Sequence, residues 1–198
     1  MKCILNEKCE KKYKLFEISE EKTIVPGEID NQTLRDVLTY FQYRAPNIDS
    51  LKSPLLEREY HDGLFQKMIA NKMKYSLYDD IDNVRKNYSK FALDGDSICS
   101  GCKRFICARH SGNSRSAPGQ KESDLECLLR HMRNALAHSS IYLAMESKKY
   151  NAILFEDNNL NGKSSARIVC CQADLMKWRT LLLKAVKEQE DRKKSISD

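Results

Sequence analysis

The stretch DLECLLRHMRNALAHSSIYLAM, residues 124–145, decides the fold predicted for this chain. Apolar residues recur in it at intervals of three and four, the spacing of a helix that buries one face. Ser123 stands directly before it as a candidate N-cap. The stretch therefore predicts the most regular helix of the protein. Its apolar positions are Leu125, Leu128, Leu129, Met132, Leu136 and Leu143.

The other side of this predicted helix carries a polar cluster. Arg130, Asn134 and His138 are four residues apart and share one face, because a helix turns by about 100° per residue. Arg133 lies on the flank between this face and the apolar stripe. Small residues around the cluster, such as Ala135, would let another backbone approach closely.

These residue types suit a phosphodiester. His138 would accept or donate a proton near neutral pH, and the planar guanidinium of Arg133 would hold a phosphate oxygen. Asn134 would orient the imidazole or the phosphate. The alternative is structural: Arg133 pairs with an acidic residue, and His138 completes hydrogen bonds at the helix end.

Outside this segment, only 7 Gly and 4 Pro in 198 residues favour long helices with few breaks. We expect one domain over residues 1–198, because no linker or internal repeat is visible. Asn161-Gly162 predicts the turn of a hairpin between strands 150–156 and 165–171, and residues 188–198 predict a frayed tail. The further predicted helices cover residues 34–44 with Asp30 as N-cap, 53–75 from Ser53-Pro54, 79–93, and 173–189.

Residues 97–121 are predicted to form a basic, cysteine-containing loop insertion. The net charge of the chain is +6, and no acidic residue lies between Asp96 and Glu122. The segment is either a solvated surface loop or a surface that faces phosphates. On the second interpretation the substrate-binding residues are Lys103, Arg104, Arg109 and Arg115, together with Arg130 of the central helix.

The eight cysteines are expected to be thiols or metal ligands. No secretory signal and no apolar run long enough for a membrane span is visible, so we predict a cytoplasmic protein without a membrane partner. Cys99, Cys102, Cys107 and His110 form a candidate ligand set for a structural zinc ion. The alternative is that these cysteines are small apolar residues of a partly buried loop.

The six residues from Arg133 to His138, RNALAH, resemble the R-x4-H signature of HEPN ribonucleases. The surrounding segments are also similar to small stand-alone HEPN proteins of bacterial defence, plasmid-conflict and phage-conflict systems. The resemblance covers about residues 120–187 and rests on the segments LLRHMRNALAHSSI, YNAILFED and RIVCCQADLMKWRTLL.

The resemblance implies an all-α helical bundle with a small β-hairpin between the last two helices. It assigns catalysis to Arg133 and His138, with Asn134 as the supporting polar residue. It also implies a metal-independent endoribonuclease of the toxin–antitoxin or abortive-infection kind, which cleaves RNA by attack of the 2′-hydroxyl. The RNA would be a tRNA or an mRNA, and a cognate antitoxin or nucleotidyltransferase is a candidate partner.

A homodimer is part of the same expectation. Arg133 and His138 point about 140° apart around a straight helix, so they converge only if the helix bends or a second copy supplies one of them. Two other functions stay open: a non-catalytic HEPN-like dimer that binds RNA or a nucleotide, and a zinc-stabilised adaptor that uses residues 97–121.

Overall fold

The structure is a computed structural model that describes nine segments of the chain. These are residues 15–17, 26–70, 73–80, 82–83, 97–99, 105–110, 113–146, 149–159 and 164–197. Within this part of the chain, no helix combines the length and the apolar character that crossing a bilayer requires. Of the predicted helix 79–93, only residues 79, 80, 82 and 83 lie among the described residues.

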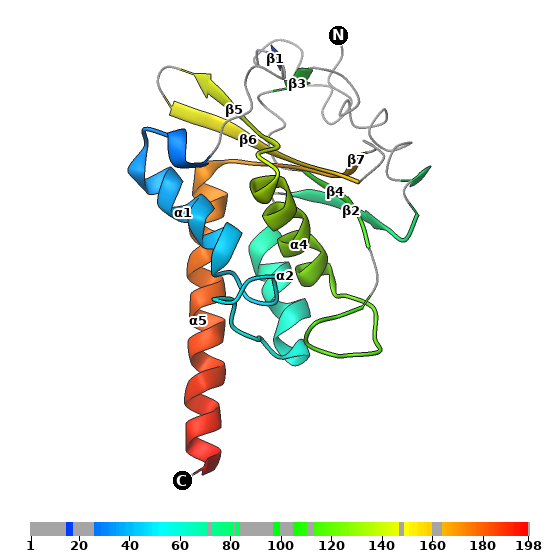
Figure 1. Ribbon diagram of the computed structural model, residues 1–198, viewed down its shortest axis with the longest axis vertical. Helices are drawn as coiled ribbons and strands as arrows, with labels where there is room; N and C mark the ends of the chain where they lie inside the picture. Colours follow the sequence, from blue (N-terminus) through cyan, green and yellow to red (C-terminus); the bar gives the residue numbers. More distant parts are fainter. Residues whose placement is uncertain are drawn as a thin grey trace.

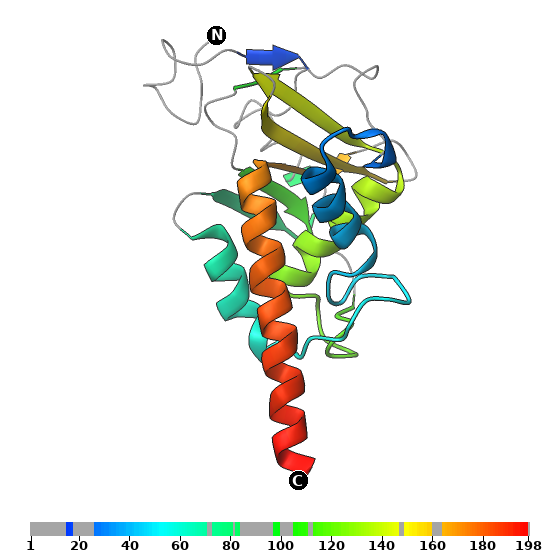
Figure 2. The same cartoon turned by 90° about the vertical axis from the view of Figure 1, so that its left-hand side faces the viewer.

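A five-stranded sheet and a layer of helices beneath it form the fold (Figures 1 and 2). The strands follow the spatial order β2-β4-β7-β6-β5, and only β2 and β4 run parallel. Their bounds are β2 Lys74–Tyr78, β4 Phe105–Arg109, β5 Ile141–Glu146, β6 Lys149–Asn158 and β7 Ser164–Cys170. The helices are α1 Gln32–Tyr43, α2 His61–Ile69, α4 Asp124–Ala137 and α5 Gln172–Ser197. Two short strands, β1 Leu15–Glu17 and β3 Ser97–Cys99, pair separately, and 3-10 turns occur at Pro26–Glu28 and Arg58–Tyr60.

The fold is mixed α/β, so the predicted all-α bundle is wrong. The predicted hairpin exists as β6 and β7, with Phe155 opposite Ile168. However, β5 and β4 extend it on its two sides. Strand β4 lies inside the segment predicted as a loop insertion, and its first four residues are fully buried. A continuous apolar run without alternation is typical of a strand covered on both faces.

The central helix α4 ends earlier than predicted. Ser123 is its N-cap, as expected, and its side chain accepts a hydrogen bond from the backbone of Glu126. The helix stops at Ala137, because Ser139 adopts a positive φ of 54° and turns the chain into β5. Leu143 therefore belongs to a strand rather than to the apolar stripe of the helix. Three consecutive apolar residues, 141–143, fit a strand as well as a helix.

The predicted helix 53–75 is reduced to α2. Asn47 prevents an earlier start, because its side chain accepts from the backbone N–H of Leu56 and donates to the Leu56 carbonyl, both at 2.9 Å. This pair of hydrogen bonds occupies the backbone groups that a helix would need. At the other end, the last two residues of the predicted helix belong to β2, Lys74–Tyr78, which pairs with β4. The first helix, α1, is capped by Asn31 rather than by Asp30.

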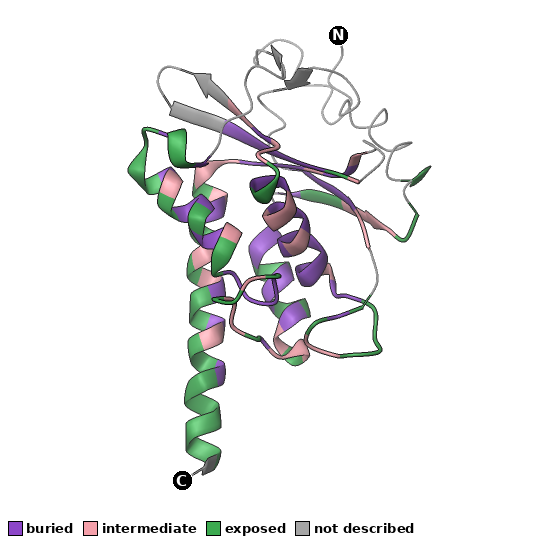
Figure 3. Cartoon of the chain, in the orientation of Figure 1, coloured by how far each residue is buried: buried purple, intermediate pink, exposed green. Residues whose placement is uncertain are grey.

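Helix α5 runs through Ser197, across the residues predicted to fray. Its first half is anchored in the core, where Trp178 is fully buried and donates to the Met68 carbonyl at 2.9 Å. Its second half is largely exposed and extends past the other helices (Figure 3). Gln189 and Lys193 still contact the segment before α2: Gln189 accepts from the backbone of Glu57, and Lys193 pairs with its carboxylate at 2.8 Å.

Candidate functional site

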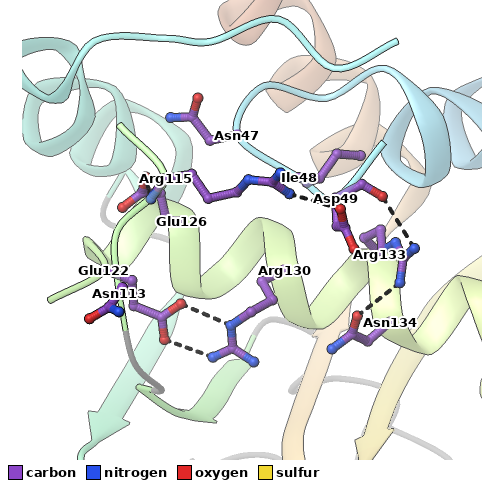
Figure 4. A pocket seen from close by; sticks show the side chains of 10 residues that line it. All are labelled: Asn47, Ile48, Asp49, Asn113, Arg115, Glu122, Glu126, Arg130, Arg133 and Asn134. Carbon is purple, nitrogen blue, oxygen red and sulfur yellow. Dashed lines mark hydrogen bonds and ion pairs between the residues drawn. The ribbon is translucent and has the colours of Figure 1, made fainter. Parts of the chain in front are cut away.

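A small pocket, with a volume of about 80 Å³, lies along the polar face of α4 (Figure 4). The turn after α1 and the segment 113–122 form its other walls. Its lining residues are Asn47, Ile48, Asp49, Asn113, Arg115, Glu122, Glu126, Arg130, Arg133 and Asn134. Three of the predicted site residues of α4 therefore meet in one concave surface.

Arg133 is held by neutral groups. One guanidinium nitrogen donates to Asn134 Oδ1 at 3.3 Å, and the other donates to the backbone carbonyl of Asp49 at 3.2 Å (Figure 4). Among the described residues, no carboxylate forms an ion pair with Arg133. The structural alternative for Arg133, pairing with an acidic residue, is therefore not what this part of the chain shows. Its charge remains available to an anion in the pocket.

Arg130 has a different environment. Its Nε and Nη2 donate to the two carboxylate oxygens of Glu122 at 2.8 and 2.7 Å. The same Nη2 donates to the carbonyl of Arg109 at 3.0 Å. Glu122 is almost fully buried and pairs with Arg130, whose bond to the Arg109 carbonyl ties α4 to the end of β4. Arg130, predicted to bind substrate, already has its charge matched within the chain.

A buried chain of polar contacts runs beneath Asn134. Asn134 Nδ2 donates to Asp157 Oδ2 at 3.1 Å, and His131 Nδ1 lies 2.6 Å from the same oxygen. Burial lowers the pKa of His131, although the Asp157 hydrogen bond opposes this shift. Burial by itself would raise the pKa of Asp157, but the hydrogen bonds from His131 and Asn134 lower it overall. His131 Nε2 also lies 2.8 Å from the Arg109 carbonyl oxygen, so both ring nitrogens of His131 face an oxygen acceptor.

Sequence reasoning missed the partners in this chain of contacts. Asp157 looked like part of a hairpin turn, and no local pattern links it to α4. His131 offered a weak signal, since it precedes Asn134 by three residues on the same helix.

His138 lies at the other end of the helix. It is the C-cap residue of α4, its side chain is exposed, and its backbone N–H donates to the Asn134 carbonyl at 2.9 Å. It does not line the pocket that Arg133 lines. Among the described residues, no hydrogen bond joins the side chains of Arg133 and His138, and the two do not share this pocket.

The remaining predicted substrate-binding residues are dispersed. Arg115 lines the pocket, where its Nη1 lies 3.3 Å from Asp49 Oδ1. Arg109 is half-buried at the end of β4. Lys103 and Arg104 lie outside the described residues.

The carboxylate of Glu126 shapes the pocket wall. Its Oε1 accepts from the backbone N–H groups of Arg115 and Ser116 and from the Ser114 hydroxyl, at 3.0–3.1 Å. Its Oε2 accepts from the backbone of Ser123 and from Arg58. Burial acts to raise the pKa of Glu126, but these hydrogen bonds outweigh it and lower the value. A single ionised side chain thus organises both the helix start and the loop beside it.

Of the predicted zinc set, the structure describes the side chains of Cys107 and His110. Cys107 is fully buried on β4 and alternates with Ile106 and Ala108, which face the helices. His110 instead follows the strand and lies beside the start of α4, where its Nε2 is 3.1 Å from Asp124 Oδ1. The Cys99 side chain and Cys102 fall outside what the structure describes.

A family model described as HEPN pEK499 p136 matches residues 59–193. The chain belongs to this HEPN family. The match begins just before α2, includes the five-stranded sheet and the RNALAH segment of α4, and ends near the end of α5. It confirms the HEPN resemblance found in the sequence. In this HEPN protein the central helix packs on a sheet, and α1 lies outside the matched region. No curated protein and no solved structure gives a significant match.

Proposed function

We propose that this HEPN-family protein is a metal-independent endoribonuclease of a toxin–antitoxin, abortive-infection or other anti-phage or anti-plasmid system. HEPN domains are often ribonucleases. The observation that carries the proposal is Arg133, a guanidinium at a pocket with no carboxylate partner among the described residues. Its neighbour Arg130 has its charge matched by Glu122.

The residues suggest a simple reaction. Arg133 binds a non-bridging phosphate oxygen and stabilises the negative charge of the transition state. The ribose 2′-hydroxyl attacks the adjacent phosphorus, and the 5′-oxygen of the next nucleotide leaves. The 2′-hydroxyl loses its proton and the leaving 5′-oxygen gains one, and His138 is the acceptor or the donor of that proton. Asn134 holds the guanidinium of Arg133 through its 3.3 Å hydrogen bond. The products are a 2′,3′-cyclic phosphate and a 5′-hydroxyl, and this chemistry needs no metal ion.

The proposal requires two chains. Since His138 does not line the Arg133 pocket of its own chain, we propose that a second copy, related by a two-fold axis, supplies it. The proposed substrate is a tRNA or an mRNA in the cytoplasm, and a cognate antitoxin or nucleotidyltransferase would restrain the activity.

The test compares the wild type with Arg133→Ala and His138→Ala, and with Lys187→Ala as an exposed control on α5. We expect expression of the wild type and the control to slow growth and fragment total RNA, whereas both site variants are tolerated. In Mg²⁺-free buffer the purified wild type should cleave RNA but not a strand with 2′-deoxyribose at the cleavage position. Full toxicity of either site variant, or an absolute need for Mg²⁺, would refute the proposal.

A second candidate function is a non-catalytic dimer that binds RNA or a nucleotide. The separation of His138 from the Arg133 pocket favours it, because binding alone does not need the imidazole. It predicts RNA binding without cleavage, lost in Arg133→Ala but unchanged in His138→Ala.

A further inference from the structure

Three different kinds of metal ligand meet where β4 ends and α4 begins. His110 directly follows β4, Glu122 precedes the N-cap of α4, and Cys127 lies in the first turns of that helix. One donor atom of each lies within 4.8 Å of the others. The Glu122 side chain and Cys127 are buried, and the His110 side chain is only 18% exposed. We propose that His110, Glu122 and Cys127 bind one zinc ion, which ties the end of β4 to the start of α4.

The separation of His110 from Glu122 suits two ligands of one ion better than a direct contact. His110 Nδ1 and Glu122 Oε1 are 3.8 Å apart, too far for a hydrogen bond. Nitrogen, oxygen and sulfur ligands lie about 2.0–2.3 Å from zinc, so a tetrahedral site places donor atoms about 3.3–3.7 Å apart. A small inward movement of the three side chains would reach this geometry, and a water molecule would occupy the fourth position.

The contacts of His110 suit a metal ligand. Its Nε2 lies 3.1 Å from Asp124 Oδ1, so a metal-binding ring would carry its proton on Nε2. The lone pair is then on Nδ1, the nitrogen that faces Glu122. A carboxylate behind a histidine ligand is a common way to fix its tautomer and ring orientation. Glu122 is fixed in turn by Arg130, and a carboxylate has further lone pairs for a metal.

Charge and ligand type both point to zinc. With Cys127 as a thiolate, Cys127, Glu122 and Asp124 carry three negative charges, and Arg130 supplies one positive charge. A divalent ion neutralises the remainder. Binding breaks the S–H bond of Cys127, and the proton passes to solvent. Thiolate and imidazole select zinc over Mg²⁺ and Ca²⁺, which prefer oxygen ligands.

This ligand set differs from the one expected from the sequence, and His110 is the residue they share. It also differs from the proposed RNA-cleaving residues, since Arg133, Asn134 and His138 take no part in it. The zinc ion would act structurally, by holding the Glu122–Arg130 pair and the adjoining pocket wall in place.

The experiment measures bound zinc in the full-length protein by elemental analysis. We expect one zinc ion per chain in the wild type and its loss in both His110→Ala and Cys127→Ala. Asp124→Ala, which removes the carboxylate behind His110, should weaken zinc binding about 10–100-fold. Cys107→Ala is the matched control: it removes a buried cysteine that belongs to the sequence-predicted set, and it should keep its zinc.

Two further readouts do not depend on enzyme activity. Cobalt-substituted wild type should show a thiolate-to-cobalt charge-transfer band that Cys127→Ala lacks. Added zinc should raise the melting temperature of metal-free wild type but not that of His110→Ala, whose partly exposed side chain makes it the safer variant for folding. A wild type that binds no zinc, or loss of zinc in Cys107→Ala but not in His110→Ala and Cys127→Ala, would overturn the proposal.

Discussion

The side-chain amide of Asn134 donates to Asp157 Oδ2 at 3.1 Å, and this contact decides which way the amide points. A carboxylate can only accept, so the NH2 group of Asn134 faces Asp157 and its oxygen faces Arg133. Asp157 lies on β6, far along the chain from α4. A strand of the sheet thus orients a side chain of the proposed RNA-cleaving site.

We predict that Asp157→Ala lowers the free energy of unfolding by about 1–3 kcal/mol, because it leaves buried hydrogen-bond donors without an acceptor. The same variant should slow RNA cleavage, since the Asn134 amide is then free to rotate. Asp157→Asn should lose less stability, because its amide oxygen still accepts from both donors. Urea denaturation measures the difference, with the exposed Asp191→Ala as control. Equal stability of Asp157→Ala and wild type would rule out this role.

Stability should fall as the pH drops below about 6.5. Burial lowers the pKa of both His61 and His131 in the folded chain. The unfolded chain then binds more protons below the ordinary histidine pKa, so acid favours unfolding. The contribution of the two neutral histidines to folding stability is complete above about pH 6.5. It is lost as the pH falls toward the pKa values of these histidines in the folded chain.

Denaturant titrations at several pH values between 5 and 8 measure this effect. His61→Gln should make the dependence shallower, whereas the exposed His138→Gln should not alter it. A stability that stays flat across this range would contradict the prediction.

Replacing Glu126 should loosen the wall of the pocket. Glu126→Gln removes the charge that accepts from the backbone of Arg115 and Ser116 and completes the capping box with Ser123. We expect a loss of about 1–3 kcal/mol in the free energy of unfolding and faster hydrogen exchange at the two loop amides. Glu188→Gln removes an exposed ion pair on α5 and should cost less than about 1 kcal/mol. Unchanged exchange at Arg115 and Ser116 would show that Glu126 does not hold the loop.

The proposed two-chain site predicts complementation. Sedimentation should give a mass near twice 22.9 kDa. When Arg133→Ala and His138→Ala are mixed under conditions of subunit exchange, about a quarter of the wild-type activity should return, because half of the dimers are mixed and each has one intact arginine–histidine pair. A monomer that cleaves RNA would contradict the two-chain site.

Local signals in the sequence predicted several elements correctly. Ser123 before an apolar stripe identified the start of α4, and the β6–β7 hairpin followed from strand-prone runs around Asn161-Gly162. The predicted helix 173–189 exists as the first part of α5. The RNALAH segment led to the HEPN family, which the family match confirms.

Errors arose where long-range pairing overrides local preference. The predicted helix 53–75 includes the first two residues of β2, and the predicted helix 124–145 includes most of β5. Both segments join the sheet instead, because their backbone groups find partners in β4 and β6. Asn47 illustrates the same point. Its side chain forms two hydrogen bonds with the backbone of Leu56, nine residues later, and these bonds prevent Leu56 from joining a helix.

The sequence by itself determined the central helix, its cap, and the arginine, asparagine and histidine that it carries, because helix periodicity and capping act within a few residues. Only the tertiary structure decided the partners of these side chains. Glu122 matches the charge of Arg130, Asp157 orients Asn134, and Arg133 meets backbone and amide oxygens at the pocket. Such contacts join segments distant in the chain, and they form only when the sheet and the helices pack against each other.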